Sequence, residues 1–195
     1  YVYGVYTVGS NSCNSDTATV SVTYNSCVSS LIPDFASTTA NTPASGNFLT
    51  NDGNPAGLVS SASPLNGPAH GTITIGTSGS YTYIPNSGFS GYDVVVVQVC
   101  DATPTCLTDT IYFTIIPNAV ADNYSANSLG SNTTINGNVS VNDIGTGIAG
   151  NVSLINGVAN GIIVLDTLGN FSYTPNSGYC GTDAFTYSVC DQNAL

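Results

Sequence analysis

The chain repeats itself at an interval of about 90 residues, and this repeat constrains the fold more than any other feature of the sequence. The segment from His70 to Asp93 matches the segment from Asn160 to Asp183 at a constant spacing of 90 residues. Further upstream, residues 46–52 match residues 137–143, with one extra residue between the two blocks. Each copy of a tandem repeat forms one structural unit, so the fold must be complete within about 90 residues.

The repeat predicts three parts. Residues 1–27 read as the last strands of a preceding repeat, because Cys13–Val20 matches Cys106–Phe113. Residues 28–117 form a complete repeat, called repeat 2 here, and residues 118–195, called repeat 3, lack a final strand. We expect that the sequence is part of a longer array of repeats. Alternatively, chains assemble head to tail, and the first strands of one chain complete the open domain of a neighbour.

Short alternating segments predict an all-β fold. Thr72–Ile75 and Tyr81–Ile84 alternate polar and apolar residues around a glycine-containing turn, which is typical of a β-hairpin. In repeat 2 we expect strands near residues 34–40, 46–51, 57–64, 71–76, 80–84, 92–100 and 107–116. This spacing predicts tandem immunoglobulin-like β-sandwiches. The run Val94–Val97 predicts one strand that is buried on both faces.

The charge composition excludes several classes of function. The chain has no Lys or Arg and a formal net charge of −11, all of it from Asp. Binding to nucleic acid or to an anionic membrane surface requires basic residues, and no segment is apolar enough to insert into a membrane. With one His and no Glu, Lys or Arg, the chain lacks most acid, base and oxyanion-stabilising groups. We therefore expect an exported protein that is not an enzyme.

The repeated motif resembles a known group of proteins. Tyr81-x-Tyr83-x-Pro85-Asn86-x-Gly88-Phe89-x-Gly91-x-Asp93 and its second copy from Phe171 to Asp183 resemble the tandem cadherin-like repeats of giant bacterial adhesins. Val99–Asp101 and Val189–Asp191 are similar to the form found in surface proteins of Bacteroidota. The resemblance implies an extracellular, cell-surface location and neighbouring repeats or other copies of the chain as partners.

Two functions fit this reading. The first is a stiff structural shaft of a secreted surface adhesin or extracellular filament. The alternative is an adhesive module that binds carbohydrate or protein on host, prey or neighbouring cells, with tyrosine faces that stack on sugars. The tyrosines considered for such faces are Tyr1, Tyr3, Tyr6, Tyr81, Tyr83 and Tyr92.

Calcium is a candidate ligand. Ten of the eleven Asp occur in pairs related by the repeat, and the resemblance implies Ca²⁺ at domain junctions. Calcium requires several oxygen ligands that converge, while a lone Asp often caps a turn instead. The candidate ligands are Asp34, Asp52, Asp122 and Asp143.

The six cysteines predict disulfides, as expected for an exported protein. Cys100 and Cys106 lie across a turn between two adjacent strands and are expected to bond. The counterpart partner of Cys190 would fall near position 196, and Cys13 is expected to bond Cys27. Cys180 either pairs with Cys190 or crosslinks to another chain.

Glycosylation is a further expectation. Three Asp-Thr-x triplets resemble the O-glycosylation motif of Bacteroidota, although threonine is also common in strands. The candidate acceptors are Thr17, Thr110 and Thr167.

Overall fold

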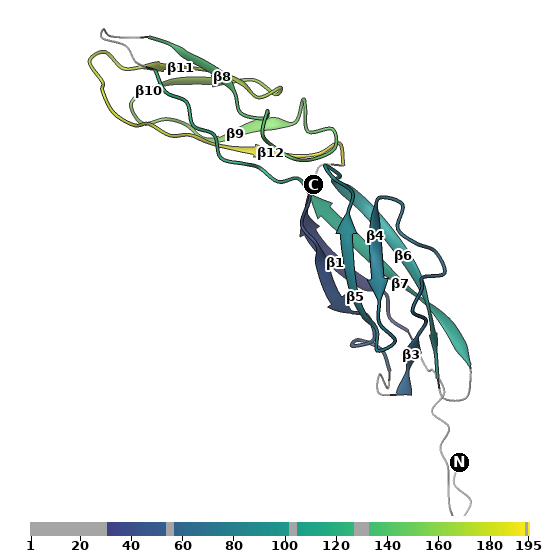
Figure 1. Cartoon of the computed structure of the whole chain (residues 1–195). Coiled ribbons are helices and arrows are strands. Elements are labelled where there is room, and N and C mark those ends of the chain that lie inside the picture. The colour runs from purple at the N-terminus through teal and green to yellow at the C-terminus, as the bar shows by residue number, and fades with distance from the viewer. Residues whose placement is uncertain (1–30, 54–56, 102–104, 127–132, 194) are drawn as a thin grey trace, which may run out of the picture.

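The computed structural model describes residues 31–53, 57–101, 105–126, 133–193 and 195. These residues form two β-sandwiches placed end to end, repeat 2 and repeat 3 (Figure 1). The described residues form no helix, and hence none that is long and apolar enough to cross a membrane. The predicted all-β fold with tandem immunoglobulin-like sandwiches is confirmed.

Repeat 2 contains seven strands in two sheets. They are β1 (Asp34–Thr39), β2 (Ala44–Asn47), β3 (Val59–Ser60), β4 (Gly71–Ile75), β5 (Ser80–Pro85), β6 (Gly91–Cys100) and β7 (Cys106–Ile116). One sheet has the order β1-β7-β6-β3, with β1 parallel to β7, and the other has the order β2-β5-β4. Side chains from both sheets and from the segments that flank β2 and β3 form the core, including Phe48, Leu49, Leu58, Tyr83, Val95, Val97, Val99, Ile111, Phe113 and Ile115.

Three strand predictions were wrong in detail. The second strand ends at Asn47 because its side-chain oxygen accepts a hydrogen bond from the Leu49 N–H at 2.9 Å, which turns the chain. The third strand is only two residues long, Val59–Ser60. The run of valines in β6 is not buried on both faces, since Val94 is 40% exposed while Val95 and Val97 are fully buried.

Repeat 3 contains five strands, namely β8 (Ile135–Asn138), β9 (Val152–Asn156), β10 (Gly161–Leu165), β11 (Asn170–Pro175) and β12 (Thr186–Val189). They form a sheet of order β10-β11-β8 and a pair, β12-β9. Among the described residues of repeat 3, the buried apolar core contains only Val139, Val152 and Phe171. Residues 119–126 run along this sandwich without forming a strand (Figure 1).

The two repeats contact each other directly. β7 ends at Ile116, and Ile144 of repeat 3 packs against the core of repeat 2. Ser90, in the loop before β6, donates its backbone N–H to the Thr146 hydroxyl at 3.2 Å, and the Thr146 N–H donates to the Ser90 hydroxyl at 2.9 Å. Hydrogen bonds in both directions therefore join the end of repeat 2 to the start of repeat 3.

Candidate functional site

The most strongly repeated motif forms a structural clamp in each sandwich. In repeat 2 the Tyr83 hydroxyl donates to Asp93 Oδ2 at 3.0 Å, and Asp93 also accepts the backbone N–H groups of Ala69 and His70, both at 2.9 Å. The glycine of the motif, Gly88, has a φ of +76°, which explains why the turn before β6 requires glycine.

Repeat 3 contains the same clamp. The Tyr173 hydroxyl lies 3.2 Å from Asp183 Oδ2, and Asp183 accepts the N–H groups of Ala159 and Asn160 at 3.0 and 2.7 Å. Because these carboxylates accept hydrogen bonds from backbone N–H groups, the repeated spacing of the motif serves folding rather than ligand binding.

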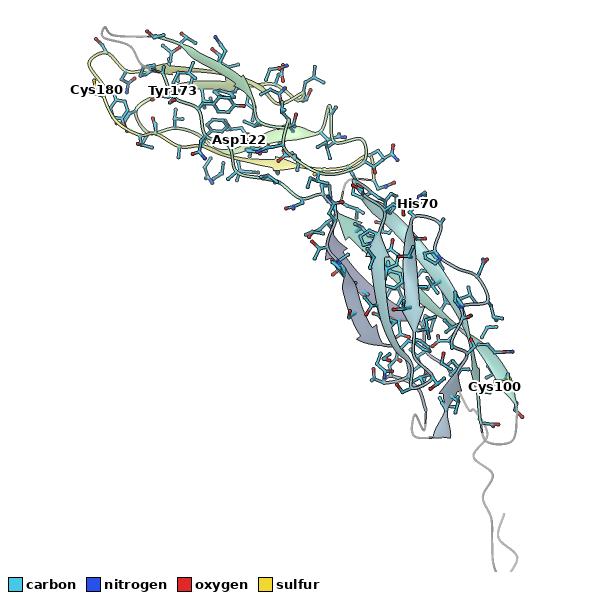
Figure 2. All side chains as sticks on the ribbon, viewed as in Figure 1. His70, Cys100, Asp122, Tyr173 and Cys180 are labelled. Atoms are coloured by element: carbon cyan, nitrogen blue, oxygen red, sulfur yellow. A yellow bond between two sulfur atoms is a disulfide. The ribbon has the colours of Figure 1, made fainter. Side chains whose placement is uncertain are left out.

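The structure confirms one of the predicted disulfide pairings. Cys100 and Cys106 form a disulfide that joins β6 to β7, with 4.0 Å between their Cα atoms. Cys180 and Cys190 are not bonded, so the predicted alternative of a Cys180–Cys190 bridge is wrong. Cys180 is exposed at the end of repeat 3 that points away from repeat 2 (Figure 2), whereas Cys190 occupies the position equivalent to Cys100. Cys13 and Cys27 lie outside the described residues.

Repeat 2 brings three carboxylates together at one end of its core. Asp52 is 5% exposed, and Asp109 on the inward face of β7 is 2% exposed. Burial and the neighbouring carboxylates of Asp109 and Asp52 raise the pKa of Asp34 to about 7. Burial, opposed by a hydrogen bond from the Thr110 N–H and reinforced by Asp52, raises the pKa of Asp109 to about 6.

These three carboxyl groups have little compensation in the fold. In each one, Oδ2 is buried and has no hydrogen-bond partner among the described residues. Since the chain contains no Lys or Arg, no basic side chain can neutralise them. In this carboxyl cluster of Asp34, Asp52 and Asp109, burial therefore favours the protonated forms of Asp34 and Asp109.

In repeat 3 the hydroxyl of Tyr187 contacts the carboxylates of Asp122 and Asp143, which are the equivalents of Asp34 and Asp52. The Tyr187 hydroxyl lies 3.0 Å from Asp122 Oδ2 and 3.2 Å from Asp143 Oδ1. A phenol has a single proton to donate, so only one of the two carboxylates can receive it. Burial raises the pKa of Asp143, which favours a second proton at this pair. The equivalent of Tyr187 in repeat 2 is Val97.

The structure thus places the predicted calcium ligands in pairs, Asp34 with Asp52 and Asp122 with Asp143. The sequence did not indicate the third member of the cluster in repeat 2, Asp109, because it lies far from the others along the chain. No group of three or more His, Cys or Asp side chains in the described residues is arranged to hold a metal ion. Calcium binding stays a prediction.

The remaining candidate residues lie on the surface or in the core. His70, the single histidine, is exposed and stacks on Phe89 with 4.3 Å between ring centroids. Thr110 is half-buried in β7, Thr167 is exposed in the turn between β10 and β11, and Thr17 lies outside the described residues.

The tyrosine faces differ from expectation. Tyr83 is fully buried and Tyr81 is half-buried, so neither belongs to an open face, while the tyrosines at positions 1, 3 and 6 lie outside the described residues. The outer surface of the β1-β7-β6 sheet carries a different aromatic patch. Phe35 stacks on Tyr112 at 5.3 Å, and Tyr92 on the same sheet is 58% exposed. Phe35 and Tyr112 were missed, although alternation along β7 could have placed Tyr112 outward.

Repeat 3 has an open groove. The cavity is about 720 Å³ and lies between residues 119–126 and the side chains of Phe171 and Tyr173 on β11, Phe185 just before β12 and Tyr187 on β12. Figure 2 shows Asp122 and Tyr173 within this part of repeat 3. In repeat 2 the equivalent position is filled by β7, and Phe113 stacks on Tyr83 at 4.2 Å. The groove therefore exposes side chains that a further strand covers in repeat 2.

Comparison with known proteins identifies the repeats. The profile of a family described as "Bacterial Ig domain" matches residues 29–114 and 116–195. No curated protein matches the chain.

Several solved structures show low similarity. Two endo-fucoidan hydrolases from glycoside hydrolase family 107 are 14% and 11% identical, with TM-scores of 0.32 and 0.25. The matches cover 82% and 80% of this chain but 26% and 30% of those chains. A Bacteroides ovatus protein of the mixed-linkage glucan utilization locus, SGBP-B, is 12% identical with a TM-score of 0.24, over 84% of this chain and 41% of that chain. Similarity at this level says nothing about what this chain binds.

Proposed function

Because the chain belongs to the bacterial Ig domain family and contains two tandem copies of that domain, we propose that it is a structural segment of a secreted bacterial adhesin or extracellular filament. In this role it is a stiff shaft on the cell surface. Its partners are neighbouring repeats and other copies of the chain.

The direct contact between repeats 2 and 3 is the observation that carries this proposal. Asn118 bridges Ile144 within repeat 3, two residues after the end of β7, and Ile144 packs against the core of repeat 2. The reciprocal Ser90 and Thr146 hydrogen bonds then hold the loop of one sandwich against the other. A short, hydrogen-bonded connection limits rotation between domains, which is what a shaft requires.

Composition supports an extracellular location. The Cys100–Cys106 disulfide is of the kind that persists in oxidising compartments. Without Lys or Arg the chain offers no site to trypsin-like proteases, and its surface of Ser, Thr, Asn and Tyr can pack against another chain without desolvating charges.

We also propose that the chain is not catalytic. Its single histidine stacks on Phe89 at the surface, and the buried carboxylates of the described residues face one another or accept backbone N–H groups. None of these arrangements places a base beside a nucleophile.

Small-angle X-ray scattering of the chain tests the shaft. We expect two sandwiches in line, each about 35 Å long as judged from strands of ten or eleven residues, with one narrow distribution of distances. A variant with six Gly-Ser residues inserted after Asn118 is the matched control, and its distribution should broaden. If the native chain scatters like the variant with the insertion, the repeats move independently and the shaft is refuted.

The aromatic patch of Phe35, Tyr112 and Tyr92 favours the alternative function of a carbohydrate-binding module, because exposed rings can stack on sugars. A glycan array probed with this chain and with Tyr112→Ala distinguishes the two. Specific binding that Tyr112→Ala abolishes would favour the adhesive module, whereas no binding by either form favours the shaft.

A further inference from the structure

The strand β10 forms an open, apolar sheet edge in repeat 3. It lies at one side of the sheet β10-β11-β8, and β11 is its only strand partner among the described residues (Figure 1). The two outward side chains of this strand, Ile162 and Val164, are 67% and 63% exposed. Their cross-strand neighbours on β11 are polar, Thr174 and Ser172. An exposed apolar edge of this kind favours pairing with another strand.

Repeat 2 has the same edge with polar side chains. Its strand β4 is equivalent to β10 and also lies at the side of its sheet, in the order β2-β5-β4. The outward residues of β4 are Thr72 and Thr74, at the positions of Ile162 and Val164. The open edge is therefore a property of the fold that both sandwiches share, and its apolar side chains distinguish repeat 3.

We propose that β10 is a contact between copies of this chain, in which β10 of one copy pairs antiparallel with β10 of a second copy about a twofold axis at Ile163. The inference deepens the proposed shaft, on which it rests, by naming a lateral contact between shafts. Addition of a strand to an open sheet edge is an established mode of recognition. A twofold axis requires a surface that is complementary to itself.

The hydrogen bonds within repeat 3 show which backbone groups of β10 face the open edge. In an antiparallel ladder, successive residues direct their N–H and C=O groups alternately to one neighbour and to the other side. The Asn176 N–H donates to the Asn160 carbonyl at 2.8 Å. The Asp166 N–H donates to the Asn170 carbonyl at 2.9 Å, so the even-numbered residues of β10 bond to β11. The residues whose N–H and C=O groups point to the open edge are Gly161, Ile163 and Leu165.

An axis at Ile163 pairs these groups in both copies. Ile163 then lies opposite Ile163 of the second copy, and Gly161 lies opposite Leu165, as hydrogen-bonded pairs. The residues between them form non-hydrogen-bonded pairs, in which side chains approach more closely. Ile162 of each copy lies opposite Val164 of the other. Two β-branched apolar pairs therefore form on the outer face of the joined sheet, where they stabilise the contact.

The distribution of charge favours the same register. Each copy has a formal net charge of −11, so two copies repel each other at long range. Residues 161–165 contain no charged side chain, and Asp166 would lie opposite Asn160 of the second copy. No two carboxylates oppose each other in this ladder. An axis two residues away, at Leu165, would instead place Asp166 opposite the apolar Val164.

The contact is small and therefore weak for one pair of chains. Each copy contributes a strand of five residues, and we expect the buried area to fall below the roughly 1,200–2,000 Å² of stable complexes. Shafts that lie side by side would form several such contacts at once, and their combined strength would exceed that of one contact.

Sedimentation equilibrium of the native chain up to millimolar concentration tests the contact, with a mild reductant that keeps the exposed Cys180 thiol reduced. We expect a monomer–dimer equilibrium that added salt strengthens, because salt screens the repulsion between copies. Ile162→Thr with Val164→Thr gives β10 the outward residues of β4, and this variant should dimerise roughly fivefold more weakly.

Thr72→Ser with Thr74→Ser is the matched control, because it changes the equivalent positions of repeat 2. It should leave dimerisation unchanged. A native chain that stays monomeric at every concentration and salt would overturn the inference, and so would a loss of dimerisation that is equal in the two double variants.

Crosslinking tests the register. The Cα atoms of a non-hydrogen-bonded pair lie about 4.5 Å apart, which a disulfide can span. When an Ile162→Cys chain and a Val164→Cys chain are mixed and oxidised with oxidised glutathione, position 162 of one should join position 164 of the other. Mass spectrometry of chymotryptic peptides identifies this crosslink. Chymotrypsin is used because the chain has no Lys or Arg.

Either variant oxidised alone should give little 162–162 or 164–164 crosslink, because those positions are offset along the ladder by two residues. Equal yields from the mixture and from the separate variants would refute the register and with it the twofold contact. The proposed shaft would survive that result, because its scattering test depends on the geometry of repeats 2 and 3 within one chain.

Discussion

The Tyr83–Asp93 clamp offers a stringent test of how repeat 2 is stabilised. Tyr83→Phe removes only the hydroxyl, which donates to Asp93 Oδ2 at 3.0 Å in a site where Tyr83 is fully buried and Asp93 is 4% exposed. The ring remains stacked on Phe113. Burial and the bond to Asp93 raise the pKa of Tyr83, so the hydroxyl remains a donor at neutral and mildly alkaline pH.

The magnitude follows from the surroundings of this bond. A hydrogen bond to a charged group contributes about 1.5–3 kcal/mol, and Asp93 keeps three backbone donors after the substitution, the N–H groups of Ala69, His70 and Val94. We therefore expect Tyr83→Phe to lower the free energy of unfolding of repeat 2 by about 2 kcal/mol. Tyr173→Phe is the matched control, because the same bond is 3.2 Å long and lies in the open half of repeat 3. There we expect less than about 1 kcal/mol.

Native-state hydrogen exchange followed by mass spectrometry separates the two repeats. In Tyr83→Phe the amides of β6 and β7 should exchange roughly 30-fold faster, since each 1.4 kcal/mol corresponds to about a factor of ten. In Tyr173→Phe the amides of β11 should change by less than about fivefold. Equal effects of the two substitutions, or no effect of Tyr83→Phe, would refute the argument that burial gives the clamp its strength.

Three further predictions concern charge and crosslinks. The folded-state pKa values of Asp34 and Asp109, about 7 and about 6, lie above the usual 3.8. Their contribution to stability is therefore complete below pH 4 and is lost as the pH rises through 6 and 7. The midpoint of thermal unfolding should be lower at pH 8 than at pH 5, and Asp34→Asn should reduce this difference between the two midpoints. Millimolar calcium should raise the midpoint at pH 8 if these carboxylates bind it, and a midpoint that EDTA leaves unchanged contradicts a calcium site. Cys100→Ser with Cys106→Ser opens a short loop and should cost about 2 kcal/mol in urea unfolding, while an unchanged urea midpoint would show that the disulfide adds nothing to the fold.

Much of the fold could be predicted because it depends on local patterns. Alternation in Thr72–Ile75 and Tyr81–Ile84 correctly predicts the hairpin of β4 and β5, since successive side chains of a strand face opposite sides. The six-residue spacing of Cys100 and Cys106 correctly predicts their disulfide, because adjacent antiparallel strands bring such positions opposite each other. The second strand was predicted to end near residue 51, but it ends at Asn47 because the side chain of Asn47 accepts a hydrogen bond from the Leu49 N–H.

The candidate sites depended on contacts between distant segments. The repeat shows that Asp109 is equivalent to Asp16, but it does not show that Asp109 lies beside Asp34 and Asp52. Only the folded sandwich brings these three residues together. Tyr83 was expected on an open face, but packing against Phe113 buries it.

By itself, the sequence determined that the chain is an all-β array with a period of about 90 residues, without basic residues and with cysteines placed for hairpin crosslinks. These properties follow from periodicity and composition, which are local. Only the tertiary structure decided which carboxylates share a core and which tyrosines reach solvent. Those outcomes depend on how two sheets pack across a core, and no run of neighbouring residues encodes that arrangement.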